Sequence, residues 1–261
     1  MAEGENHHGD EASVRAVTPL ELVLVRHGES VGNVLATAAQ RNGDETIRIG
    51  ERDADVPLSS LGVEQATALG GRLAEILGDA DRTLVWSSPY VRAVQTADTA
   101  LRAAGADLPI RLDERLRDRE LGILDLLTWL GVQRLLPQEA KRRRWLGKFY
   151  HRPPGGESWA DVVLRLRSFL HEALAEPHTD RIVLFSHDAV ITLVRYVLEG
   201  MREADVLALA TREPVLNASV TRLRRSRDGA WELKEYNDVS HLQTAGAPVT
   251  HHKGESDVRP H

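Results

Sequence analysis

The chain has 261 residues, enough for one large α/β domain or two small ones. Its formal net charge of −6 gives no broad basic surface for nucleic acid, and no apolar run approaches the ~18 residues of a membrane span. We therefore expect neither nucleic acid nor a membrane as a partner. The absence of cysteine excludes disulfides, thiolate metal sites and cysteine nucleophiles.

The two ends of the chain are polar and lack hydrophobic periodicity. Residues 1–17 are predicted to be a disordered lead and residues 239–261 a disordered tail, so that 18–238 form a single domain. The lead has neither the basic start nor the apolar stretch of a signal peptide, and we expect a cytoplasmic protein. Histidine pairs at 7–8 and 251–252 are interpreted as incidental, so no metal site is predicted.

Strand-like and helix-like segments alternate along the predicted domain. Short continuous apolar runs, typical of buried parallel strands, occupy residues 20–25, 83–88 and 181–186. Apolar residues at helical spacing predict helices within 59–77, 89–101, 155–174 and 189–200. Ser88 and Pro89 are predicted to start one of these helices, and Ser158 with Asp161 resembles a capping box at another.

The end of the domain and its middle differ from this alternation. Residues 217–226 and 230–237 flank Arg-Asp-Gly and predict a hairpin. Residues 123–156 are rich in leucine and then in basic residues, which indicates a helical insertion over the C-terminal edge of the strands. The predicted fold is therefore α/β, a three-layer α/β/α sandwich with a mostly parallel central sheet.

Two of the apolar runs stop at a histidine and then turn into a helix. His27 ends "VLVRH" and His187 ends "VLFSH". In open α/β sheets, ligands bind outside the carboxyl ends of the strands, so both side chains fall where a site belongs. Small and polar residues follow the two histidines, and their backbone N–H groups are expected to point towards an anion: Gly28, Glu29 and Ser30 after the first, and Asp188 after the second.

Two arginines accompany these histidines. Arg26 precedes His27, and Arg92 lies in the first turn of the helix that follows a third strand. Taken singly, a histidine at a strand end is usually a hydrogen-bonded core residue and an arginine usually a surface residue. Together at three strand ends, they predict an anion-binding site.

Several motifs now resemble one known family. "RHGES" with Asn33, "DVPLSSLGVEQA", "SSPYVRAVQTA", "PPGGES", "FSHDAV" and "NASV" look like the histidine phosphatase superfamily, which includes cofactor-dependent phosphoglycerate mutases and the fructose-2,6-bisphosphatase domain. The resemblance extends from about residue 20 to 237. It implies a phosphoglycerate mutase-like fold and phosphoryl transfer on a small phosphorylated substrate, with no cofactor.

The resemblance also assigns roles. His27 would be the nucleophile and would form a phosphohistidine, because a neutral imidazole with one unprotonated nitrogen is a nucleophile at pH 7. Arg26, Arg92 and a protonated His187 would supply positive charge around the phosphoryl oxygens. The residues expected on the substrate side are Gly28, Glu29, Ser30, Asn33, Asp188 and Arg152.

The general acid is less well defined. The family uses an acid in a loop of the form L-x-E-x-x-x-G, and the matching stretch "LRDRELG" places Asp118 at that position instead of the usual Glu. Asp118 is preferred, Glu120 is the reserve candidate, and Glu114 comes behind both. Asp188 is a second departure, because the family usually has Gly after this histidine, and its carboxylate would repel a phosphate unless turned away or paired.

Three functions stay open at this point. The insertion carries a basic run that either lines a pocket or faces solvent. Leu121 stands where mutases have a tyrosine, which favours a phosphatase acting on a small phosphorylated metabolite. A phosphoglycerate mutase-like phosphotransferase is the alternative, and a catalytically inactive phospho-ligand binding module is the second alternative. The leucine-rich insertion would also allow a homodimer.

Overall fold

The computed structural model describes residues 20–78 and 82–252, so the predicted lead at 1–17 and the last part of the predicted tail lie outside it. Within those residues one sheet has six strands in the order β3-β2-β4-β1-β5-β6. The strands are β1 (Glu21–Arg26), β2 (Thr83–Ser87), β3 (Ile110–Leu112), β4 (Arg181–Ser186), β5 (Val220–Arg225) and β6 (Trp231–Asp238). The first four strands are parallel to one another, whereas β5 is antiparallel to β1 and β6 is antiparallel to β5; this confirms the predicted α/β fold with a mostly parallel sheet.

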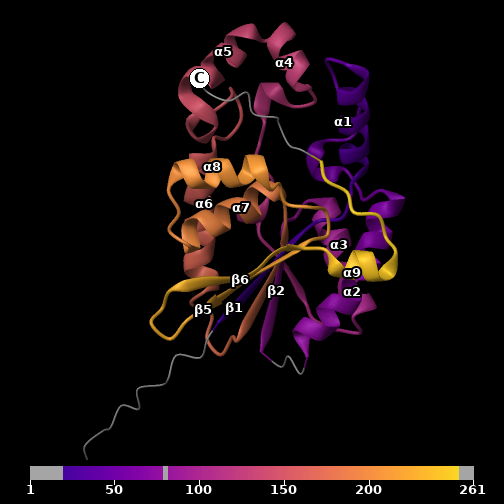
Figure 1. Ribbon diagram of the computed structural model, residues 1–261, viewed down its shortest axis with the longest axis vertical. Helices are drawn as coiled ribbons and strands as arrows, with labels where there is room; N and C mark the ends of the chain where they lie inside the picture. Colours follow the sequence, from indigo (N-terminus) through magenta and orange to yellow (C-terminus); the bar gives the residue numbers. More distant parts are fainter. Residues whose placement is uncertain (1–19, 79–81, 253–261) are drawn as a thin grey trace, which may run out of the picture.

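Helices cover both faces of the sheet and its carboxyl end (Figure 1). They are α1 (Val31–Asn42), α2 (Ser60–Leu77), α3 (Val91–Ala103), α4 (Trp129–Leu135), α5 (Pro137–Tyr150), α6 (Trp159–Ala173), α7 (Asp188–Leu198), α8 (Glu203–Arg212) and α9 (Ser240–Ala245). The predicted insertion supplies α4 and α5, which lie at the same end of the molecule as α1 (Figure 1). None of the helices in the described part is long and apolar enough to cross a membrane.

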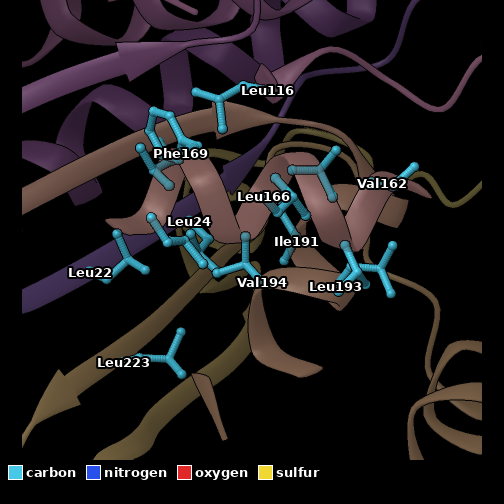
Figure 2. Close-up of a cluster of buried hydrophobic side chains, with 14 of the residues drawn as sticks. Leu22, Leu24, Leu116, Val162, Leu166, Phe169, Ile191, Leu193, Val194 and Leu223 are labelled. Atoms are coloured by element: carbon cyan, nitrogen blue, oxygen red, sulfur yellow. The ribbon is translucent and has the colours of Figure 1, made fainter. Parts of the chain in front are cut away.

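Two apolar cores sandwich the sheet because successive side chains of a strand point to opposite faces. Leu22 and Leu24 of β1 enter the first core, where they pack with Phe169 of α6 and Ile191 of α7 (Figure 2). Val23 and Val25 enter the second core, against α2 and α3. Burying each such side chain contributes about 1.5–3 kcal/mol, so β1 is held rigidly from both sides. This rigidity fixes the position of the residues that follow β1.

The local predictions at the helix and hairpin ends have different outcomes. The hairpin between β5 and β6 and the capping box of Ser158 and Asp161 are confirmed. The predicted start of α3 is wrong, because this helix begins at Val91 and Ser88 does not cap it. The Ser88 hydroxyl lies 2.9 Å from the Nε2 atom of His187 and is thus used in the site instead.

The predicted disorder of the tail is wrong for its first part. Residues 240–245 form α9, which packs on α2 and fully buries Leu242. A six-residue helix with one apolar anchor carries no periodicity that a sequence pattern could reveal. Beyond α9 the chain continues towards α1 (Figure 1), where His252 is hydrogen-bonded to Thr37.

The loop after β1 lies against the start of α2 with no room for extra atoms. A Cβ atom on Gly62 would come within 2.0 Å of the Glu29 carbonyl oxygen, and one on Gly28 within 2.6 Å of the Gly62 carbonyl oxygen. The Ser59 N–H donates to the same Glu29 carbonyl at 2.9 Å. Glycine is therefore required here for close backbone approach.

Gly62→Ala is expected to lower the free energy of unfolding by roughly 1–3 kcal/mol, because backbone must move to admit the methyl group. Gly71→Ala is the matched control in the same helix, where a Cβ meets nothing within 4 Å. It should raise stability by up to about 1 kcal/mol through helix propensity. Urea unfolding of both variants measures the difference; equal stabilities would contradict the close approach.

Candidate active site

The two predicted histidines lie side by side. The parallel pairing of β1 with β4 sets Arg26 opposite Ser186, so the next residue of each strand reaches the same point. The imidazole centroids of His27 and His187 are 5.2 Å apart, and both rings are buried. The expected juxtaposition at the carboxyl ends of the strands is confirmed.

The tautomer of His27 follows from its neighbour. Its Nδ1 atom lies 2.6 Å from the carbonyl oxygen of Gly28. Because a carbonyl oxygen can only accept, Nδ1 carries the hydrogen and donates it. In the neutral ring this leaves the lone pair on Nε2, which is the nitrogen available for attack on phosphorus.

The surroundings keep His27 neutral. Burial lowers the pKa of its imidazole well below the ordinary value, and the charges of Arg92 and Arg26 lower it further. The hydrogen bond to Gly28 opposes this effect more weakly. An uncharged nucleophile therefore stands among cations, which suits an approaching phosphate dianion.

The two predicted arginines are buried beside the histidines. Arg92 donates to the backbone and side-chain oxygens of Asp53 at 2.5 and 3.1 Å, and to the Asp118 carboxylate at 3.4 Å. Arg26 donates to the carbonyl oxygen of Val215. Its buried Nε atom has no hydrogen-bond partner among the described residues, which leaves a donor for a phosphate oxygen.

His187 differs from the expectation of a protonated ring. Burial and the charges of Arg92, Arg26 and Arg165 hold the pKa of His187 well below its usual range, so the ring is neutral before substrate binds. Its Nε2 atom contacts the Ser88 hydroxyl, and its Nδ1 atom lies 3.4 Å from the Asp118 carboxylate. A bound phosphate dianion would favour the protonated form of the ring.

The acid candidates differ in their distance from this cluster. Asp118 directs one carboxylate oxygen to within 3.4 Å of both Arg92 and His187, and its side chain is 30% exposed. Glu120 instead accepts from the Tyr90 hydroxyl at 3.0 Å, and the Tyr90 ring lies against His187. Glu114 begins a short 3₁₀ turn, Glu114–Leu116, earlier in the loop.

The loop predicted to bind the anion is mostly engaged with the protein itself. The backbone N–H groups of Gly28, Glu29 and Ser30 donate to the side chains of Thr96, Gln65 and Asn33, respectively. The Glu29 carboxylate accepts from Ser59 and contacts His252. These N–H groups thus hold the loop in place, and the expectation that they point at an anion is wrong for the described structure.

The other residues predicted to contact substrate differ in their surroundings. Asn33 uses its carbonyl oxygen inside the protein, which leaves its amide N–H₂ as a donor for substrate. One oxygen of the Asp188 carboxylate accepts from the Val215 N–H and the Thr192 hydroxyl, each at 3.4 Å, so this side chain is partly engaged within the protein. Arg152 forms an ion pair with Asp161 at the start of α6 and is not brought into the histidine cluster.

Comparison with models of known protein families identifies the family of this chain. The model of the histidine phosphatase superfamily (branch 1) matches residues 22–239. The chain belongs to that superfamily.

Similar proteins and solved structures match this chain over most of its length. A probable phosphoglycerate mutase of Proteus mirabilis is 30% identical, over 85% of this chain and 95% of its own. A mycobacterial glucosyl-3-phosphoglycerate phosphatase, solved with VO₃, is 30% identical over 84% of this chain and all of its own, with a TM-score of 0.65. A putative α-ribazole-5′-P phosphatase of Escherichia coli, 21% identical with a TM-score of 0.67, shows the shared fold. Together with the family, the phosphatase neighbours support a phosphoric monoester hydrolase.

Sequence reasoning missed several supporting residues of this histidine phosphatase. Ser88, Gln65 and Asn217 are fully buried and bond to the histidine cluster or its loop. All three lie in the motifs "SSPYVRAVQTA", "DVPLSSLGVEQA" and "NASV" that carried the resemblance. Those motifs were the available signal, but the partner of each side chain depends on the fold.

We expect kcat/KM to decrease on acidification only at pH values below 6.5. Because the pKa of His27 is lowered, its ring is neutral at and above that pH and is protonated, hence not nucleophilic, only at lower pH. Nitrogen NMR of the ring should place its pKa below 6.5. Arg92→Gln removes one of the positive charges that lower the pKa of His27 and should therefore raise it; an unchanged or lower pKa would contradict this account.

Proposed function

We propose that this protein is a phosphatase that hydrolyses a small phosphorylated metabolite through a phosphohistidine on His27, without a metal ion. The proposal rests chiefly on the hydrogen bond from the His27 Nδ1 atom to the Gly28 carbonyl. This bond leaves Nε2 as the nucleophilic atom of a ring that is buried together with Arg26 and Arg92, and positive charge near the nucleophile is what phosphoryl transfer requires.

The reaction has two steps. In the first, Nε2 of His27 attacks phosphorus, the ester P–O bond breaks, and the leaving alkoxide takes a proton. In the second, water attacks phosphorus, the P–N bond breaks, and inorganic phosphate leaves. Arg26, Arg92 and His187 stabilise the charge on the phosphoryl oxygens in both transition states.

Asp118 is proposed as the proton donor of the first step and the base of the second. Its carboxyl group is next to His187 and Arg92 and is partly open to solvent, so it lies beside the place of the phosphoryl group. Glu120 is held by Tyr90 and reaches the cluster only through that ring. This geometry favours Asp118 over its reserve.

The mutase alternative is favoured by the name of the Proteus mirabilis relative, a probable phosphoglycerate mutase. One observation argues against a highly basic pocket for it, because the Arg152 guanidinium is paired with Asp161. Arg143 stacks over Trp129 and Lys148 over Trp159, contacts that hold these side chains but leave their charges in place. The pairing of Arg152 removes one charge that could retain a phosphorylated intermediate against water.

The phosphohistidine is tested by single-turnover mixing with radiolabelled 3-phosphoglycerate or nitrophenyl phosphate in EDTA. We expect acid-labile, base-stable label on the protein that decays to free phosphate. In His27→Ala the label should be absent and turnover should fall on the order of 10⁴-fold. Label that persists until a phosphoryl acceptor is added indicates the mutase, and no label or turnover across a panel of phosphoesters indicates a binding module.

The role of Asp118 is tested by comparing leaving groups. Asp118→Asn should slow hydrolysis of an alkyl phosphate by roughly 100-fold, the usual size of general acid catalysis, and affect nitrophenyl phosphate much less. Glu120→Gln is the matched control and should stay near the wild-type rate. The reverse result, with Glu120→Gln the slower enzyme, transfers the acid role to Glu120.

A further inference from the structure

The segment after α9 is placed against the loop that carries the nucleophile. We define the C-terminal strap as residues 246–252, which continue from α9 towards α1 (Figure 1). Two fully buried amides, Gln65 of α2 and Asn217 before β5, lie between the strap and the loop after β1. Each of them is hydrogen-bonded on both sides.

Gln65 connects the loop to the strap. Its Oε1 atom accepts from the Glu29 N–H at 2.8 Å. Its Nε2 atom donates to the Pro248 carbonyl at 2.9 Å and to the Thr250 hydroxyl at 3.0 Å. The Glu29 N–H is a donor, so the amide cannot be reversed without losing this bond.

Asn217 joins the strap to the backbone of the nucleophile, His27. Its Oδ1 atom accepts from the Thr250 hydroxyl at 3.2 Å, and its backbone N–H donates to the Thr250 carbonyl at 3.1 Å. Its Nδ2 atom donates to the His27 carbonyl at 3.1 Å and to the Asn33 side chain at 3.3 Å.

These bonds form one continuous hydrogen-bond network, called here the circuit, in which each group donates to the next. It runs from the Glu29 N–H through Gln65, Thr250 and Asn217 to the His27 carbonyl. The Thr250 hydroxyl accepts from one amide and donates to the other. A hydroxyl can do both at once, whereas a methyl group can do neither.

The circuit acts on the peptide unit that orients the nucleophile. The Glu29 N–H and the Gly28 carbonyl belong to the same peptide unit, and in a trans peptide they point in opposite directions. Gln65 holds the N–H on one side, which turns the Gly28 oxygen towards the Nδ1 atom of His27 on the other. This hydrogen bond is the one that exposes Nε2 as the nucleophile.

We infer that Thr250 is a positioning residue for His27, and that the C-terminal strap is part of the active site through the Gln65–Thr250–Asn217 circuit. A second contact anchors the strap, because the His252 ring bonds to the Glu29 carboxylate at 3.1 Å and to Thr37 at 2.6 Å. The inference deepens the proposed function and rests on it where turnover is concerned.

The test compares Thr250→Val with the conservative Thr250→Ser and with a matched control. Thr244→Val makes the same chemical change in α9 at an exposed hydroxyl, whose one hydrogen bond within residues 20–78 and 82–252 is to the Ser240 carbonyl of its own helix. Thr250→Val should lower kcat about 10-fold with KM within about 2-fold, because the nucleophile is misplaced while the cationic site persists. Thr250→Ser should restore most of the rate, and Thr244→Val should match the wild type.

Nitrogen NMR of the His27 ring provides a readout that does not depend on turnover. The wild type should show the Nδ1–H tautomer, and Thr250→Val a mixture of both tautomers. If Thr250→Val does not fold, Thr250→Ala removes the same hydroxyl without adding volume and takes its place.

Each result has a defined meaning. An unchanged tautomer in Thr250→Val overturns the inference, as does a loss in Thr244→Val as large as that in Thr250→Val. If the wild type turns over no phosphoester, the proposed function fails, while the tautomer comparison still decides whether Thr250 positions His27.

Discussion

The hydrogen bonds between β1 and β4 are the constraint on which the site depends. They set Arg26 opposite Ser186, and the residue after each strand is then a histidine. Both strands are buried on their two faces, so neither can slide without turning its apolar side chains into the wrong core. The distance between the two imidazoles is therefore set by the register of the sheet rather than by the flexibility of a loop.

The charge balance of the site follows from this rigidity. Buried guanidinium groups would normally be matched by carboxylates, and Arg92 is matched by Asp53 and Asp118. Arg26 keeps one unpartnered donor in the described structure. Burial and the charges of Arg26 and Arg92 keep both imidazoles neutral, so the free site holds an uncharged nucleophile beside two guanidinium groups. A phosphate group can accept from the unpartnered Arg26 donor, which gives substrate binding and transition-state stabilisation the same electrostatic origin.

The buried strands and the place of the site could be predicted from the sequence because both depend on local patterns. Continuous apolar runs indicated the buried strands, and the histidine that ends two of them indicated where the site lies. Asp118 was instead implied by the resemblance of "LRDRELG" to the acid loop of the family, and its role stays a prediction. The roles of Ser88 and Gln65 could not be predicted, because each bonds to a residue that only the folded sheet brings near. The same holds for α9, whose single fully buried anchor, Leu242, gives no repeating pattern.

The position of the strap in the sequence affects the order in which the active site folds. The nucleophile lies near the start of the chain, but the hydroxyl that closes its supporting circuit bonds to Gln65 across 185 positions. Contacts so distant in sequence form late, since a long loop must close before they are made. A nascent chain that has already built β1, α1 and α2 therefore carries His27 without its support. His27 gains this support only when the strap has been synthesised and docked, so activity depends on a segment that is made long after the nucleophile.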